Sequence, residues 1–429
     1  MKIVEFIMNQ ILGQTYILFA LIAFIGYLAL KEGLTKAITG AVKTAIGVLV
    51  MGQGAGLMIS TFNSLLNPLN EKFGMTGILL DVYVTMTIAN TKLGEYVAWS
   101  AYTLFFSFIL NIIFVTFKKY TRIRTVFLTG NVMLIQTAIS TYMVYYFFDM
   151  GMIGTVFIAS LITVLYWGFF SGLLIKPVTE ITGSEEFTIG HQQMFGSYLA
   201  YKIAPRLGSK EQDVEKMELP KWLGIFNDTI VASSIILIVF VGIIMFALGK
   251  DIVSSMSGTT NWILFIFKTG LTLSVALFIL LTGVKLFVGE IMESFKGITK
   301  KLLPGAVVAV DCAAIFSFSP KAVLLGFLGG SAGMIVAILT LIISGSPMLI
   351  VPGFIPLFFD NATIGVFANK RGGYKAALII TFCSGMIQVF GSGLAATAMN
   401  FNAWQGSFDY ATIWLGIIYA FKWLSGIIG

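Results

Sequence analysis

Two stretches, GMTGILLDVY (74–83) and PGAVVAVDCA (304–313), decide the fold, because each sets one aspartate, Asp81 or Asp311, in an apolar run. An ionisable side chain at membrane depth is costly and marks a functional site by default. Irregular backbone can lie at that depth only where protein or a water-filled cavity surrounds it. The two stretches therefore predict two interrupted segments inside a membrane protein.

Composition extends this prediction to the whole chain. Of the 429 residues, 57% are hydrophobic and 11% are charged, whereas a soluble domain carries about 25% charged residues. Because so few charged side chains cannot cover a water-facing surface, most of the surface must face lipid. The short alternating segments of a membrane β-barrel are absent. The predicted fold class is an all-α polytopic membrane protein.

A bilayer crossing needs about 20 mostly apolar residues in a helix, and eleven such segments follow one another along the chain. They cover residues 12–30, 41–62, 96–117, 125–148, 152–175, 225–248, 262–287, 321–344, 347–368, 374–396 and 409–428. Residues 63–95 and 296–320 carry Asn, Asp, Ser and Pro among apolar residues, and we predict that they form two re-entrant hairpins. No cleavable signal peptide is evident, so we expect the first helix to be retained.

Positive charge predicts the orientation of the chain. With the N-terminus outside and the C-terminus in the cytoplasm, seventeen Lys and Arg residues face the cytoplasm and four face outward. The cytoplasmic set is Lys31, Lys36, Lys118, Lys119, Arg122, Arg124, Lys176, Lys202, Arg206, Lys210, Lys216, Lys221, Lys296, Lys300, Lys301, Lys370 and Arg371. The outer set is Lys2, Lys72, Lys92 and Lys250. Because such loops account for the net charge of +7, we expect no nucleic-acid partner.

The two opening stretches also belong to a longer internal match. Gly56 and Phe62 align with Gly289 and Phe295, then Asp81 with Asp311, and later LTGN with VPGF, always in the same order. Five predicted crossings separate the copies, which would invert their topology. We therefore predict a first repeat over 1–224, with the cytoplasmic loop 176–224, a second repeat over 225–405, and an extra C-terminal helix over 406–429. Inverted repeats place a substrate site near the midplane; chance similarity between apolar segments is the alternative.

Polar side chains in apolar surroundings are the candidate site residues. His191, the only histidine, lies in EEFTIGHQQMFGSYLAYK (185–202), where His-Gln-Gln offers several donors and acceptors for a polyhydroxylated ligand. The alternative is a structural histidine that caps a helix. For Asp311 the alternatives are a helix N-cap or a structural pair with a lysine. Asn131 and Gln136 lie in an otherwise apolar helix and could instead bind a neighbouring helix.

Several chemistries have no sequence signal. Motifs for ATP binding, dinucleotide binding and zinc ligation are missing, which argues against an ATP-driven pump, a membrane oxidoreductase and a zinc protease. Cys312 and Cys383 indicate neither a disulfide nor a metal site. We therefore expect no cofactor, no metal and no catalytic nucleophile in this chain.

The strings RTVFLTGN (124–131), GHQQMF (190–195), LPGAVVAVDCAAIFSFSP (303–320) and VPGFIPLFFDNATIGVFAN (351–369) resemble the ascorbate-type enzyme IIC, the membrane permease component of the bacterial phosphoenolpyruvate-dependent phosphotransferase system. The resemblance runs from about residue 20 to about residue 405. It implies an eleven-helix homodimer in the inner membrane, with inverted repeats, a V-shaped scaffold and a mobile core that moves as an elevator. It also implies that a cytoplasmic IIB protein, charged by IIA, phosphorylates the imported sugar.

The resemblance carries over residue by residue. Tyr83, His191, Gln192 and Asp311 match ligand-contacting positions, with Asn131 and Gln136 as neighbouring candidates. Asp81 and Asn361 are second candidates. The family pattern has histidine at Asn131 and glutamine at Ile135, so the implied substrate widens from L-ascorbate to a related small sugar acid or polyol.

Two other functions stay open. One is a proton- or sodium-coupled secondary transporter of the same architecture, with Asp311 or Asp81 as the proton site. The other is a membrane-embedded enzyme, which would need a nucleophile or metal constellation that the sequence lacks. Neighbouring genes for IIA and IIB would favour the phosphotransferase function.

Overall fold

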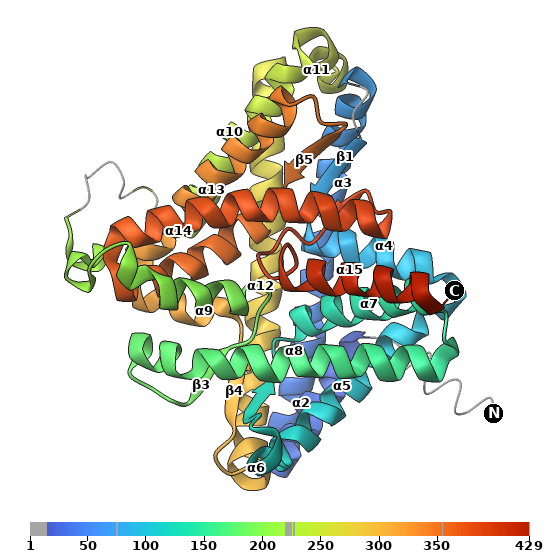
Figure 1. Cartoon of the computed structure of the whole chain (residues 1–429), viewed down its shortest axis with the longest axis vertical. Coiled ribbons are helices and arrows are strands. Elements are labelled where there is room, and N and C mark those ends of the chain that lie inside the picture. Colours follow the sequence, from blue (N-terminus) through green and yellow to red (C-terminus); the bar gives the residue numbers. More distant parts are fainter. Residues whose placement is uncertain (1–14, 74–75, 219–224, 226–227, 354, 429) are drawn as a thin grey trace.

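The computed structural model describes residues 15–73, 76–218, 225, 228–353 and 355–428 (Figure 1). Lys2 and Lys221, which entered the charge count, and residues 12–14 of the first predicted segment lie outside this part of the chain. Within it the chain is mostly helical, as the composition predicted.

Four helices form the long axis of the molecule, and we call them the axial bundle: α2 (Thr15–Ala29), α3 (Leu34–Phe73), α10 (Thr229–Leu248) and α12 (Trp262–Leu302). α3 and α12 approach closely because two glycines face each other. A Cβ on Gly283 would lie 2.4 Å from the backbone nitrogen of Met51 and 2.5 Å from the carbonyl oxygen of Gly47. Small residues let apolar membrane helices come into backbone contact in this way.

The other long helices pack beside this bundle, and Figure 1 shows α8, α14 and α15 running across its axis. They are α5 (Ala98–Thr116), α7 (Gly130–Phe148), α8 (Gly151–Thr182), α9 (Met194–Ile203), α13 (Pro320–Ile343), α14 (Asn361–Met399) and α15 (Ile413–Ile428). Short helical pieces connect them: α4 (Val82–Leu93), α6 (Lys118–Thr121), α11 (Lys250–Ser257), η2 (Gly94–Tyr96), η3 (Ala204–Arg206), η4 (Lys210–Gln212), η5 (Val214–Lys216), η7 (Cys312–Phe318) and η8 (Pro356–Asp360).

Within the described residues, six short strands that the sequence did not predict form two parallel sheets. One sheet has the order β5 (Met348–Pro352), β1 (Thr76–Leu80), β6 (Ala403–Trp404), and the other has β2 (Thr125–Phe127), β4 (Val307–Val310), β3 (Phe187–Ile189). Each central strand follows one of the two longest helices, since β1 comes after α3 and β4 comes after α12. Its two partners come from the other half of the chain. The strands therefore tie the two halves together at the centre of the molecule.

Both predicted hairpins differ in detail from the structure. In 63–95, α3 continues to Phe73 and is followed by β1 and α4, and in 296–320, α12 continues to Leu302 and is followed by β4 and η7. The physical reason is the same at both places: an aspartate directly after the strand caps the helical piece that follows. Each stretch is thus a strand followed by a helical turn, not a pair of helical arms.

Among the described residues, six helices are long and apolar enough to cross a membrane, or seven if the pair that bends by 115° between Leu248 and Lys250 forms one span. The predicted segment 374–396 lies within α14, whereas 347–368 covers β5, η8 and only the start of α14, and the α14 helix breaks at Gly373 with φ 68°. The structure therefore supports a multi-pass helical membrane protein, and the number of eleven crossings stays a prediction.

Candidate functional site

The sheet β2–β4–β3 brings together side chains that lie far apart in the sequence. Ile189 pairs with Val310, and the N–H of Gly190 donates to the Val310 carbonyl oxygen at 2.8 Å. Because residues that follow neighbouring parallel strands emerge at the same sheet edge, His191 lies beside Asp311. The distance from His191 Nε2 to Asp311 Oδ2 is 3.9 Å. Asn131 reaches the same edge after β2, in the first turn of α7.

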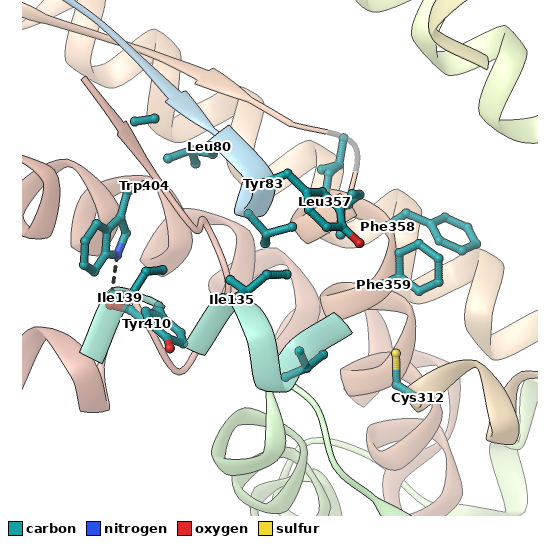
Figure 2. Packing of buried hydrophobic residues seen from close by; sticks show 14 of the residues in the cluster. Leu80, Tyr83, Ile135, Ile139, Cys312, Leu357, Phe358, Phe359, Trp404 and Tyr410 are labelled. Atoms are coloured by element: carbon teal, nitrogen blue, oxygen red, sulfur yellow. Dashed lines mark hydrogen bonds between the residues drawn. The ribbon is translucent and has the colours of Figure 1, made fainter. Parts of the chain in front are cut away.

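The second sheet delivers an aromatic side chain to the same place. After β1, Asp81 Oδ1 accepts hydrogen bonds from the backbone N–H groups of Tyr83 and Val84, both at 2.9 Å. This N-cap starts α4 and fixes Tyr83 in its first turn. Ile355 and Phe359 follow β5, and Figure 2 shows Tyr83, Ile135 and Phe359 coming from three separate elements.

These residues surround a small open pocket, with a cavity volume of about 60 Å³. Its lining consists of Val82, Tyr83, Asn131, Val132, Ile135, His191, Gln192, Lys285, Asp311, Ala313, Ile355 and Phe359. Apolar side chains form much of the wall, and a few polar groups converge from several strand ends. Five of the residues predicted to contact the ligand, namely Tyr83, Asn131, His191, Gln192 and Asp311, are brought together here.

Asp311 combines two of the roles considered for it. Its Oδ1 accepts a hydrogen bond from the Ala313 backbone N–H at 2.9 Å and so caps η7, while the residue also lines the pocket. His191 Nδ1 lies 2.5 Å from Gln193 Oε1. Because that amide oxygen can only accept, the imidazole proton belongs on Nδ1. Nε2 of His191 and Oδ2 of Asp311 are therefore both free to accept hydrogen bonds from ligand hydroxyl groups.

Two buried polar atoms of the pocket residues lack a partner within the described part of the chain. They are Oδ1 of Asn131 and Nε2 of Gln192. Buried polar atoms are nearly always hydrogen-bonded, so such exceptions need an explanation. A polar ligand in the pocket would supply the missing partners.

Three other candidates lie outside the pocket lining. Gln136 accepts a hydrogen bond from Trp167 Nε1, and Asn361 donates one to Gln388 Oε1 at 3.0 Å. Asp81 caps α4 and supports the position of Tyr83. Direct contact of these three residues with a ligand stays a prediction.

Comparison with known proteins identifies the family. The sequence profile named EIIC-GAT, "PTS system sugar-specific permease component", matches residues 10–414. The chain belongs to this family. It is also 33% identical over 445 residues to the "Ascorbate-specific PTS system EIIC component" of Mycoplasma pneumoniae (strain ATCC 29342 / M129 / Subtype 1), an alignment that covers 93% of this chain and 67% of the relative. The resemblance read from the sequence motifs is thereby confirmed.

The structure of this permease adds a positioning residue that the sequence reasoning missed. The buried Asp409 accepts hydrogen bonds from Tyr166 Oη at 2.5 Å and from the backbone N–H groups of Phe195 and Gly196 at 2.9 and 3.0 Å. Its own N–H donates to the Gln192 carbonyl oxygen at 3.3 Å. Asp409 therefore fixes the start of α9 and the loop that carries His191. No local motif marks it, because its partners lie more than 200 residues away.

His191, Asp311 and Cys312 also form a group of potential metal ligands in this permease. Each offers one ligand atom, and the three atoms lie within 4.8 Å of one another. Sequence spacing gave no sign of this group, because His191 comes from a different strand end. His191 and Asp311 line the pocket, and the function proposed below uses these two side chains to bind the ligand.

Proposed function

We propose that this permease component carries L-ascorbate, or a related small sugar acid or polyol, inward across the bacterial inner membrane while a cytoplasmic IIB protein phosphorylates it. The observation that carries the proposal is the pocket, in which Asn131 Oδ1 and Gln192 Nε2 are buried without partners beside two free acceptors on His191 and Asp311. The specificity named for the Mycoplasma relative supports ascorbate as the first ligand to test.

The role of this chain is to bind and orient the ligand. Hydroxyl groups of a small ring would donate to His191 Nε2 and Asp311 Oδ2, and Gln192 Nε2 would donate to a ligand oxygen. Phosphoryl transfer belongs to the IIB protein, which receives its phosphate from IIA. The pocket lies at strand ends that the two halves of the chain share, so a movement of either sheet would displace the bound ligand.

Asn131 and Ile135 bear on the identity of the substrate, because the family pattern has histidine and glutamine at these two positions. A ligand group left without a partner costs about 1–3 kcal/mol, so two such losses would weaken ascorbate binding about a hundredfold at ~1.4 kcal/mol per tenfold. We propose that a hydrogen bond from the unpaired Gln192 Nε2 to the ligand offsets this loss of binding free energy. Binding of ascorbate, pentoses and sugar acids to purified Asn131→His and wild-type protein tests this point. Tight ascorbate binding that the substitution leaves unchanged would show that these two positions do not set specificity.

The proposed transport mechanism is alternating access between inverted repeats, 1–224 and 225–405, followed by the helix of 406–429. Support comes from the sheets: β1 and β4 follow equivalent long helices, and each recruits two strands from the opposite half. In this mechanism the axial bundle is the scaffold of a homodimer, and the pocket-bearing elements move against it as an elevator. We expect that cysteine cross-links can join the axial bundles of two protomers while transport is retained. Efficient cross-linking of two protomers only through α14 would refute this arrangement.

The proton- or sodium-coupled transporter is the competing function. Asp81 is buried with its Oδ2 unpaired among the described residues, and Asp311 faces the pocket, so both carboxylates could in principle take up a cation. Uptake that requires an ion gradient but no IIB protein would favour this alternative over group translocation.

A further inference from the structure

One charged residue of the pocket lining was not predicted from the sequence. Lys285 lies in the middle of the 41-residue helix α12, within an apolar stretch, and its side chain borders the pocket. It makes no side-chain hydrogen bond or ion pair within the described residues. By contrast, Lys36 and Lys43 of α3 pair with Glu293 and Glu290 of α12.

An unpaired ammonium group inside a membrane helix is expensive, and such residues face a cavity, a partner charge or a ligand. Asp311 is the other charged side chain of the pocket lining, and it is already engaged at the start of η7. A neutral ligand would leave the ammonium group without a counter-charge. An anionic ligand would provide one and would form a charge-assisted hydrogen bond, which is stronger than a neutral one.

We propose that Lys285 recognises the negative charge of the substrate, so that the pocket selects an ascorbate-like enolate or a sugar carboxylate over uncharged lactones and sugars of the same size. The proposal rests on the proposed function and deepens it, because it names the charge of the transported ligand. It also explains how a site with Asn131 in place of a histidine retains a cationic group.

The origin of Lys285 in the fold gives this contact a second property. The other eleven lining residues come from α4, α7, the loop after β3, the region after β4 and the region after β5, all outside the axial bundle. Lys285 alone comes from the axial bundle. Its contact with the ligand therefore forms only while the pocket-bearing elements are seated against α12 as they are in this structure.

The test compares Lys285→Met with Lys268→Met, a matched control on the same helix, because both lysines are exposed but only Lys285 lines the pocket. Dissociation constants are measured by titration calorimetry on purified, detergent-solubilised protein for ascorbate and for the uncharged saturated lactone L-gulono-1,4-lactone. For Lys285→Met we expect ascorbate binding to weaken about ten- to hundredfold, as for a lost charged hydrogen bond, and lactone binding to change less than about threefold. Lys268→Met should match the wild type for both ligands.

Lys285→Arg keeps the charge and should retain most of the preference for the anion, which separates charge recognition from a folding defect. An unchanged ratio of the two dissociation constants in Lys285→Met would overturn the proposal. If wild-type protein does not bind ascorbate, the proposed substrate fails, and the same comparison is made with gluconate and its uncharged lactone. A preference for gluconate that disappears in Lys285→Met would then still support Lys285 as the charge-selecting residue, and equal binding of the two by the wild type would overturn it.

Discussion

Replacing Asp409 with asparagine should loosen the ligand loop without touching the pocket directly. The carboxylate accepts three hydrogen bonds, from Tyr166 and from the N–H groups of Phe195 and Gly196. Asparagine offers only one accepting atom, so at least one buried backbone N–H loses its partner, at a cost of about 1–3 kcal/mol. The substitution also removes a negative charge from the N-terminus of α9, which is worth about 0.3–2 kcal/mol.

This loss falls on the segment that holds His191 and Gln192, because Asp409 also binds the Gln192 carbonyl oxygen through its own N–H. If about 1.4–2.8 kcal/mol of this lost free energy weakens ligand binding, the dissociation constant for the ligand rises ten- to a hundredfold. Calorimetric titration of purified Asp409→Asn measures this effect, and thermal unfolding measures the accompanying loss of stability. Tyr166→Phe is the matched control, because it removes one donor but keeps both backbone hydrogen bonds, so its dissociation constant should stay within about threefold of the wild type. Wild-type binding by Asp409→Asn, or an equal loss in Tyr166→Phe, would refute the proposed positioning role.

Three further predictions follow from the same structure. Asp311→Asn keeps the size of the side chain and removes its charge, so we expect uptake to fall strongly while the protein still inserts and folds; unchanged uptake would leave Asp311 with its capping role alone. Gly283→Ala places a methyl group 2.4 Å from the Met51 backbone nitrogen and should destabilise the protein by about 1–3 kcal/mol in thermal unfolding, whereas Gly289→Ala, with open space around it, should be nearly neutral. A cysteine at Lys210 should resist a membrane-impermeant thiol reagent applied to intact cells, and its labelling from the periplasm would reverse the predicted orientation.

Composition and motifs were sufficient to predict a helical membrane protein, its family and five residues that now border one pocket. These inferences succeed because lipid exposure demands long apolar segments, and because rare polar residues within them stand out. The strands could not be predicted from the sequence, since an apolar run of three to five residues between helices has no periodicity that distinguishes a strand from a helix. Their pairing, which joins His191 to Asp311, depends on contacts between distant parts of the chain.

The geometry of the fold explains why one candidate residue lies outside the pocket and why two other residues were not predicted. Asn131 and Ile135 are four residues apart in α7 and share the face that borders the pocket, whereas Gln136 is turned about 100° further around a helix of 3.6 residues per turn and bonds with Trp167 instead. Lys285 was not predicted because a lysine in a long apolar helix, where Lys268 also lies, does not reveal by sequence which face it occupies. Asp409 escaped notice because its partners are distant in sequence.

Phosphorylation during uptake tests the central claim most directly. Right-side-out membrane vesicles containing this permease are loaded with phosphoenolpyruvate, the general phosphotransfer proteins, IIA and IIB, and labelled ascorbate is added outside. Group translocation predicts that the label inside is a phosphate ester, that it accumulates only when IIB is present, and that dissipating ion gradients leaves it unchanged. Accumulation of unmodified ascorbate without IIB, abolished when the proton or sodium gradient is removed, would contradict it and identify a secondary transporter.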